Sequence, residues 1–592
     1  MKVKNTFKVT IMATAMFAAY AYAGNPNATS TVPAFGSPGA GYAGGATING
    51  KASFLSTVPA GQSVDLVGQI TIAPGDVGET GDILALVAIP GSGGGIFQLT
   101  PTGLEPLPVQ DLLTLSITPS FTGTLPASVD IEITDLAGEL GVDLSGKEQI
   151  KFAIAYAVNG QVQSYSKPIK FGVADTPSDS VCPDGTTPEA AVVMGGNQIC
   201  TLSGTYEEDL HLTANFDYVI SGAVRIGNDN VSNPVLTIDP GVTTYGKSGN
   251  DFLWIDRGAQ IWANGTKEAP ITMTGAGDSV ATATTRGEWG GLVINGNAPI
   301  NGCVEGADIC EAAGEGQSGM FGGNDSEDSS GSLTYLVVKY AGYQINDLDE
   351  LNGIAFQGVG SGTNVDYVQV HNNQDDGVEF FGGTVNAKHL YLTGNLDDSL
   401  DWTKGWKGYV QHVVVVQGED HGDQGFEMDN NGDAPDSSPR AQPMIANVTL
   451  VGNANTDIGM LIREGTGGNF YNFVITGFGQ GCIDIDTTET FTAAGTPENL
   501  SGTLTMNNSV VDCEVNFIEE AGEAFTAEAW FDALDGNTIL DTGMDDYINS
   551  TAVNNISHFE PETLGPWFDE TDYIGAVPSA EEDWTEGWTF AP

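Results

Sequence analysis

Residues 377–403 read GVEFFGGTVNAKHLYLTGNLDDSLDWT, and this stretch contains one pattern twice. Val378 and Phe380 alternate with other residues, and 22 residues later Leu400 and Trp402 do the same. Alternation with a period of two is typical of a strand that buries one face. When such a strand recurs at a short spacing, each repeat buries its apolar face against its neighbours. The stretch therefore predicts coils stacked on coils.

The same repeat runs through much of the chain in two registers. The first register places an apolar strand start at Leu336, Val368, Leu390, Val413, Val448 and Phe473. The second places Gly353, Gly377, Ser399, Gly425, Gly459 and Gly481 just before a short strand, with Asp484 as the one polar residue at an apolar position. The blades of a β-propeller would be about 40–50 residues long. We expect a right-handed parallel β-helix over residues 206–545.

The residues before the repeat have a different pattern. Short alternating runs, such as 83–87 and 129–133, are separated by Gly, Pro and Asp between residues 51 and 175. This pattern is typical of a small antiparallel β-sandwich. The fold class is therefore all-β, with an N-terminal β-sandwich followed by the β-helix. Residues 24–50 are expected to be a flexible leader, and residues 546–592 a C-terminal tail that packs on the β-helix.

Residues 1–23 have the features of a secretory signal peptide. Lys2, Lys4 and Lys8 are followed by an apolar run over 9–19 and by a small-residue cleavage site at 21–23. The run is shorter than the ~20 residues that span a membrane. We expect a secreted protein without a transmembrane segment, at the outer cell surface or outside the cell, with the periplasm as an alternative.

Six cysteines in an oxidising compartment predict disulfides. Six allow about 15 connectivities, and proximity in the sequence favours Cys182–Cys200, Cys303–Cys310 and Cys482–Cys513. The first pair would hold a junction at residues 176–205. Zinc is not expected, because no cysteine pair has a two-residue spacer and histidines are few.

The charge balance limits the possible partners. The chain has 19 Lys and Arg against 77 Asp and Glu, a net charge of −58 over 592 residues. A surface of this sign does not neutralise nucleic-acid phosphates and does not dock on anionic membranes. It does permit cation binding. The hydrophobic share of 40% is enough for a core and excludes an acidic disordered chain.

Acidic residues recur beside the glycine register and form the strongest candidate site. Four lie two residues before it and three lie two residues after it: Asp375, Asp397, Asp423 and Asp457, then Glu379, Asp401 and Glu427. Equivalent residues of stacked coils are about 4.8 Å apart, where two charges repel by about 3.5 kcal/mol at an effective dielectric of 20. Calcium, which takes six to eight oxygen ligands, would relieve this repulsion. The alternative is that these side chains cap backbone groups at turns.

A polysaccharide hydrolase is the alternative function. Three fragments resemble motifs of polygalacturonase-type hydrolases: Gln374-Asp375-Asp376, His421-Gly422 and Ile462-Arg463-Glu464. The resemblance implies a catalytic carboxylate at Asp376, a histidine at His421 and a uronate-binding Arg463. The sequence departs from that pattern because Asn455-Thr456-Asp457 follows the aspartate pair, Glu464 replaces a lysine, and the spacings are too long.

Two further motifs resemble a known family. Residues 287–301 read GEWGGLVINGNAPIN, and the tail segment DWTEGW at 583–588 repeats the form of DWTKGW at 401–406. Both are similar to motifs of a secreted bacterial family of right-handed parallel β-helix proteins, and the resemblance covers about residues 206–592. It implies the fold and leaves the chemistry open, because that family has no settled activity.

Four aromatic residues are candidates for stacking on sugar rings: Trp406, Tyr409, Trp584 and Trp588. The alternative for each is burial in the core. The sequence as a whole favours a non-enzymatic surface or extracellular-matrix protein that binds polysaccharide or partner proteins with the support of calcium. A purely structural surface protein is a further alternative, and no oligomeric state is predicted.

Overall fold

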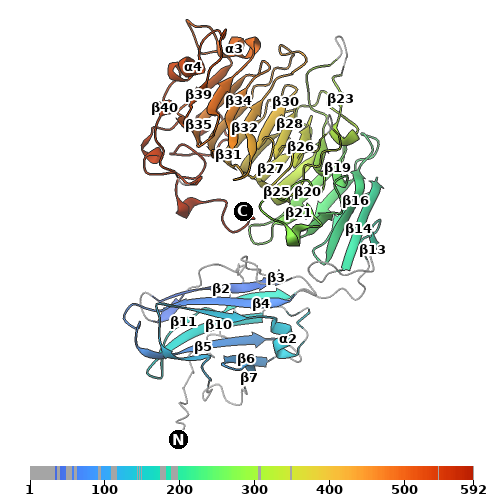
Figure 1. The fold of residues 1–592 in the computed structure, drawn as a ribbon. Helices are drawn as coiled ribbons and strands as arrows, with labels where there is room; N and C mark the ends of the chain where they lie inside the picture. Colours follow the sequence, from blue (N-terminus) through green and yellow to red (C-terminus); the bar gives the residue numbers. More distant parts are fainter. Residues whose placement is uncertain are drawn as a thin grey trace. The chain divides into compact units, whose positions relative to one another are not determined.

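The computed structural model describes most of the chain, and Figure 1 shows its course. The described residues are 34–36, 40–48, 57–58, 63–90, 95–107, 117–142, 144–145, 147, 150–173, 182–188, 198–303, 309–346, 350–544 and 546–590. The predicted signal peptide lies outside them. The chain divides into two compact units, one up to residue 181 and one from residue 198, with residues 182–191 in the second unit.

The N-terminal unit is a β-sandwich of two antiparallel sheets. Leu66 and Ile70 of one sheet and Phe152 and Ile154 of the other belong to one buried core. The two sheets approach closely at Gly68, where a Cβ atom would lie 3.1 Å from Ile154. The smaller sheet has the order β2 (Gly41–Ile48), β4 (Val64–Thr71), β9 (Ser128–Ile133). The larger sheet contains β1 (Ala34–Gly36), β11 (Gln161–Ser166), β10 (Ile150–Val158), β5 (Thr80–Ile89), β6 (Gly95–Thr100), β7 (Gly103–Pro106), β8 (Phe121–Thr124), β12 (Ile169–Val173) and β3 (Thr57–Val58). A short helix, α2 (Leu136–Leu140), follows β9.

The expectation of a flexible leader over residues 24–50 is wrong for the part that the structure describes. Strand β2 pairs with β4 along its whole length, and β1 pairs with β11. Tyr42 and Ala46 are buried against the sandwich core. The many small residues of this segment concealed a strand, because alternation is weak where glycine and alanine fill most positions.

The C-terminal unit is a parallel β-helix built on a continuous ladder of strands. Both predicted strand registers are present, since Val378 pairs with Leu400 and Val368 pairs with Leu390. One face consists of short strands, which we call the short-strand sheet. Its members are β19 (Phe252–Ile255), β22 (Gly291–Asn295), β26 (Ile354–Gln357), β28 (Val378–Phe381), β30 (Leu400–Thr403), β32 (Gly422–Met428), β34 (Thr456–Ile462), β36 (Gly481–Ile485) and β39 (Phe517–Ile518).

The opposite side consists of longer strands that bend in the middle. At the bend the backbone is left-handed, with φ of 54° at Tyr367, 49° at His389 and 64° at His412. The long strands are β25 (Gly331–Lys339), β27 (Asn364–His371), β29 (Asn386–Thr393), β31 (Tyr409–Val416), β33 (Met444–Val451) and β35 (Gly468–Thr476). In the first and last coils, the two halves of the bent strand are separate strands or parts of wider segments. These are β13 (Thr187–Pro188), β14 (Gln198–Tyr206), β15 (Leu210–Leu212), β16 (Phe216–Ile226), β17 (Val235–Ile238), β18 (Thr243–Gly246), β20 (Gln260–Asn264), β21 (Ile271–Gly275), β37 (Leu504–Asn507), β38 (Val510–Asp512) and β40 (Thr538–Ile539).

One detail of the predicted register is off by one residue. Gly481 pairs with Ile458, so Ile483 and not Cys482 is the counterpart of Met460. Asp484 then lies opposite Leu461 on the outer face of the sheet. The apparent polar residue in the core is therefore a consequence of the shifted alignment, and the core column continues through Ile483 and Ile485, which are both buried.

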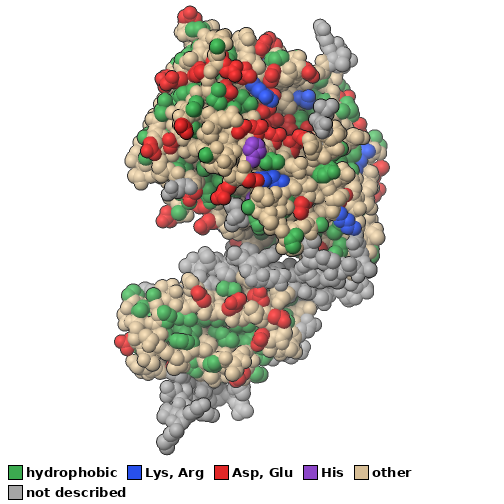
Figure 2. Space-filling model, in the orientation of Figure 1, with side chains coloured by type: hydrophobic (Ala, Val, Ile, Leu, Met, Phe, Trp, Pro, Cys, Tyr) green, Lys and Arg blue, Asp and Glu red, His purple; other side chains and the backbone are tan. Residues whose placement is uncertain are grey.

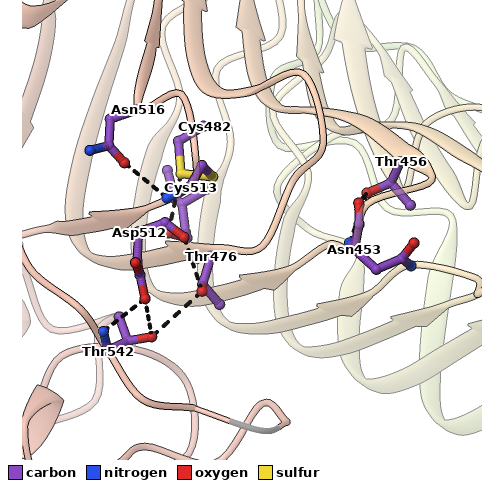
Figure 3. The surroundings of a disulfide bond; sticks show 9 residues. Asn453, Thr456, Thr476, Cys482, Asp512, Cys513, Asn516 and Thr542 are labelled. Atoms are coloured by element: carbon purple, nitrogen blue, oxygen red, sulfur yellow. Dashed lines mark hydrogen bonds between the residues drawn. A yellow bond between two sulfur atoms is a disulfide. The ribbon is translucent and has the colours of Figure 1, made fainter.

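The β-helix begins before residue 206, and disulfides join residues near both of its ends. Strand β14 pairs in parallel with β16 from Gln198 onward, so Cys182–Cys200 belongs to the first coil rather than to a separate junction. The three disulfides join the sequence neighbours Cys182–Cys200, Cys303–Cys310 and Cys482–Cys513. Around the last pair, Asn516 accepts the N–H of Cys513, and Thr542 donates to Asp512 (Figure 3). Helices α3 (Thr488–Ala494) and α4 (Ala527–Ala533) lie in these final coils.

The segment after residue 545 lies along the bent strands. Side chains of successive coils hydrogen-bond its backbone: Gln369 with Phe590, Gln411 with Asp569, Asn447 with Tyr573 and Asn472 with Phe559. Ala576 and Val577 pack on Tyr391 and Val414. Among the described residues, no helix is long and apolar enough to cross a membrane.

Candidate metal centre on the short-strand sheet

Three acidic residues stand in a row on the outer face of adjacent short strands. Glu379 of β28 pairs with Asp401 of β30, which pairs with Glu427 of β32. Alternation turns Val378 and Phe380 into the core and places the acidic residues between them on the other face. Figure 2 shows Asp and Glu side chains gathered over this part of the β-helix. The predicted second acidic column is therefore present.

A second acidic row lies beside the first, at the turns before β28 and β30 and at the second residues of β32 and β34. Burial and then the charges of Asp397 and Asp457 raise the pKa of Asp423, so three of the four predicted members lie near one another. Asp375 joins the row from the neighbouring coil, where a carboxylate oxygen lies within 4.8 Å of those of Asp397 and Glu350. The two columns of acidic residues predicted from the sequence thus form one continuous acidic surface on the β-helix.

Three groups of carboxylates have oxygens within 4.8 Å of one another, an arrangement that could hold a metal ion. We call them the acidic clusters. They are Glu350, Asp375 and Asp397; Asp376, Asp397 and Asp398; and Asp376, Glu379 and Asp401. Every donor in them is a carboxylate oxygen, which is the ligand type that calcium and magnesium prefer and zinc sites use less.

Burial and mutual repulsion raise the pKa values of these acids. Burial and then the charges of Glu350 and Glu315 raise the pKa of Asp375 to about 9. The pKa values of Glu379 and Asp401 are raised well above the usual range, first by burial and then by neighbouring carboxylates. Carboxylate oxygens of these two residues lie within 4.8 Å of each other, so a proton or a bound cation would relieve their repulsion.

Positive charge is present only at one end of the row among the described residues. Arg463 pairs with Glu427 and with Asp429, in the latter case at 3.0 Å. At the other end, Asn352 donates its amide to Glu379 at 2.6 Å. The Oδ1 atom of Asp401 is buried and accepts no hydrogen bond from the described residues. In the middle of the row, Asp401 thus has an unused oxygen, and among the described residues neither Glu379 nor Asp401 forms an ion pair, which fits a divalent cation.

The alternative interpretation, in which acidic side chains cap backbone groups at turns, applies to a neighbouring column of residues. Asn352 accepts the backbone N–H of Asp376, Asp376 accepts that of Asp398 at 3.1 Å, and Asp398 accepts that of Gln424 at 2.8 Å. Each side chain therefore caps the next coil. Turn capping therefore accounts for this neighbouring column, and Asp376 and Asp398 belong both to the capping ladder and to the acidic clusters.

The residues of the hydrolase alternative are not gathered into one group. Asp376 is buried and caps a turn, His421 is exposed in the loop before β32 and is in none of the acidic clusters, and Arg463 is paired with Glu427. A substrate would reach Asp376 poorly, because its exposed fraction is 7%.

Two of the predicted sugar-stacking residues are buried. Trp406 is fully buried and stacks on Phe380 at 4.1 Å, and Trp588 is 3% exposed and packs on Tyr335. Neither ring has a free face for a ligand, so these two predictions are wrong. Trp584 is half-buried and packs on residues of the bent strands, whereas Tyr409 is 37% exposed.

Sequence reasoning missed several members of the site. Asp376 and Asp398 follow Asp375 and Asp397 directly and repeat at the same 22-residue step, so the column spacing contained their signal. Glu350 had no such signal, because it lies in a longer insertion between strands β25 and β26.

Comparisons with known proteins agree with this architecture. Residues 204–589 match the family model described as a pectate-lyase like beta helix domain. No curated protein sequence matches the chain. Among solved structures, the catalytic unit of the thermostable GH87 α-1,3-glucanase from Streptomyces thermodiastaticus strain HF3-3 is similar at 10% identity, with 87% of this chain and 97% of that chain covered and a TM-score of 0.25. That score is too low to support an argument. The match of the family model covers well over half of the sequence, and the chain therefore belongs to the pectate-lyase-like β-helix family.

Proposed function

We propose that this chain is a secreted, non-enzymatic surface or extracellular-matrix protein whose acidic clusters bind calcium. The observation that carries the proposal is the pairing of Glu379 and Asp401. Two carboxylates on adjacent strands, one buried and one half-buried, with an unused oxygen on Asp401 and no ion pair to either among the described residues, are most stable when a proton or a cation lies between them. In a neutral, calcium-containing medium the cation is the better partner, because it compensates both charges.

Calcium would do two things at this position. It would join the coils of β28 and β30, whose ladder is otherwise opposed by repulsion, and so stabilise the β-helix. It would also leave coordination positions that no protein oxygen fills, since calcium takes six to eight ligands and each cluster offers three residues. Hydroxyl or carboxylate oxygens of a polysaccharide or of a partner protein would suit those positions.

The direct test is a calcium titration by isothermal calorimetry on the purified protein. We expect binding to the wild-type chain and its loss in the double variant Glu379→Gln/Asp401→Asn, which keeps the shape of both side chains. Asp484→Asn is the matched control, because Asp484 lies in the same outward column outside the acidic clusters. Equal calcium binding by the double variant and the wild type would refute the site.

Polysaccharide binding is tested separately with the same protein. A panel of neutral and uronate polysaccharides would be used in pull-down experiments with calcium and with chelator. Calcium-dependent capture of a uronate polysaccharide would support the bridging role. Capture that chelator leaves unchanged would assign recognition to another surface.

A hydrolase is the second candidate, and one observation favours it. Glu379 and Asp401 have carboxylate oxygens within 4.8 Å of each other, close to the separation of about 5–5.5 Å between the two carboxyl groups of retaining glycoside hydrolases. Release of new chain ends from any member of the panel, lost in Asp401→Asn, would support this activity. A lyase is less well supported, because Arg463 is held by Glu427 and Asp429 and its pKa is raised, so it does not act as a base.

A further inference from the structure

A second site lies away from the acidic clusters. A cavity of about 320 Å³ opens beside the beginning of β27 and β29, and the tail residue Trp567 forms one wall. Asn364, Asp366, Asn386 and Lys388 contribute polar side chains to the lining, and none of them belongs to the acidic clusters. The segment 361–363 and Val365 complete the lining, so one indole ring faces a mostly polar cavity.

The indole ring is held in place from several sides. Lys388 lies 4.9 Å from the ring of Trp567, and the ring of Tyr409 lies 5.7 Å away. Two residues further along, Asp569 pairs with Lys388 at 2.7 Å, and its backbone N–H donates to Gln411 at 2.7 Å. A ligand that stacks on Trp567 would meet a surface that is already ordered, which lowers the entropic cost of binding.

The polar residues of the cavity offer both donors and acceptors. Asn386 uses its carbonyl oxygen to accept the N–H of Tyr409 at 2.7 Å, which leaves its NH₂ group for a ligand. Asn364 is exposed and donates to Ser332 at 3.0 Å, which leaves its carbonyl oxygen. Asp366, 32% exposed, accepts from His389 with one oxygen and keeps the other. This alternation suits hydroxyl groups, which donate and accept at once.

We infer that this cavity binds a neutral pyranose unit of a glycan. The C–H face of a pyranose ring packs on an indole, while its hydroxyl groups bond to planar amide and carboxylate side chains. Lys388 is neutralised by Asp569, and the chain carries a net charge of −58, so an anionic sugar would be repelled. The inference is independent of calcium, because no acidic cluster takes part.

The test is calorimetry with four neutral hexasaccharides, cellohexaose, laminarihexaose, mannohexaose and maltohexaose, in the presence of chelator. We expect at least one to bind, and we expect Trp567→Ala to weaken it about tenfold or more, as removal of a central aromatic anchor usually does. Trp262→Ala is the matched control, because Trp262 is 44% exposed on a different part of the β-helix.

A second variant guards against disturbance of the tail. Asn364→Ala lies on the β-helix itself, and we expect it to weaken the same ligand with an unchanged melting temperature. The inference is overturned if no neutral hexasaccharide binds, if Trp262→Ala abolishes binding and Trp567→Ala does not, or if trigalacturonate binds only with calcium while all neutral sugars fail. The last result would leave the acidic clusters as the sole binding surface, so failure here and failure of the calcium proposal are distinguishable.

Discussion

Glu379 and Asp401 lie directly opposite each other in the parallel ladder of β28 and β30, where Glu379 is buried and Asp401 is half-buried. A like-charged pair on neighbouring strands opposes the strand pairing that holds it, because the fixed spacing of the ladder prevents the two groups from moving apart. The fold keeps this pair in the middle of the acidic row, between Asn352 at one end and Arg463 at the other. The pair therefore destabilises the β-helix whenever both groups are ionised and no cation is bound.

Replacing one member of the pair should stabilise the protein in the absence of metal. Burial and neighbouring carboxylates raise the pKa of Glu379 well above its usual range, and each tenfold change in proton affinity corresponds to about 1.4 kcal/mol. We therefore expect Glu379→Gln to raise the free energy of unfolding in chelator by up to about 1 kcal/mol, the size of a cross-strand charge effect. With calcium the wild type should be more stable than the variant, because the variant lacks one calcium ligand. Urea denaturation with and without calcium measures both, and lower stability of the variant in chelator would contradict the prediction.

The metal-free protein should lose stability as the pH rises. The pKa of Asp423 is raised to about 6, that of Glu427 to about 7 and that of Asp375 to about 9, in each case mainly by burial. These acids hold protons in the folded state that the unfolded chain releases near pH 4. Their stabilising effect is complete below that pH and is lost as the pH rises through their folded pKa values.

The measurement is the melting temperature in chelator between pH 7 and pH 9, above the ordinary pKa of histidine, which is about 6.5. We expect a steady fall, and we expect calcium to remove most of it, because calcium competes with protons for the same oxygens and binds more tightly as the pH rises. A melting temperature in chelator that increases over this range would show that the acids are ionised and stable without a cation.

Arg463 should matter more than an ordinary surface arginine. Its removal in Arg463→Gln leaves Glu427 and Asp429, whose side chains are only 15% and 14% exposed, without a counter-charge. Breaking a buried pair costs about 3–5 kcal/mol, but the guanidinium is 35% exposed and solvent screens it, so we expect about 2 kcal/mol.

The matched control for Arg463 is Asp436→Asn. Asp436 pairs with Arg440, and its side chain is 76% exposed, so the change should cost less than about 1 kcal/mol. Both are measured by urea denaturation. Equal effects of the two variants would mean that the row does not depend on Arg463.

The sequence contained the information for the strand ladder, because each core position such as Phe380 or Trp402 has an apolar partner in the next coil. It also predicted Glu379 and Asp401 as outward neighbours. It did not reveal how deeply they are buried, since period-two alternation separates two faces of a strand and does not say whether loops cover the outer one. Glu350 and Trp567 join their sites from segments outside the repeat, and local spacing carries no signal for such contacts.

Trp406 shows the same limit for a residue of the core, because the sequence pattern did not show that its side chain is buried. It follows the second strand pattern in the sequence and is a predicted sugar-stacking residue, yet it is fully buried and donates its indole N–H to the carbonyl of Val385. We expect Trp406→Ala to destabilise the β-helix by about 3–5 kcal/mol, the range for removing a large buried aromatic residue. Binding per folded molecule, measured by calorimetry below the melting temperature, should not change, and a selective loss of binding would make Trp406 a ligand contact after all.

His412 should limit stability on the acid side. Burial lowers its pKa to about 4, while the ring of His389 stacks on it at 4.6 Å and Asp569 and Lys388 lie beside it. The unfolded chain takes up a proton near pH 6.5 that the folded protein accepts only near pH 4. The contribution of a neutral His412 is therefore present above pH 6.5 and is lost as the pH falls between these values.

His412→Asn removes this proton, so the melting temperature of the variant relative to that of the wild type should rise as the pH falls from 7 to 4. His421→Asn, a change at an exposed histidine, should show no such trend. If both variants follow the wild type at every pH, the stacked histidine pair does not contribute to acid sensitivity, and the contact between the tail and the bent strands must be insensitive to the charge of His412.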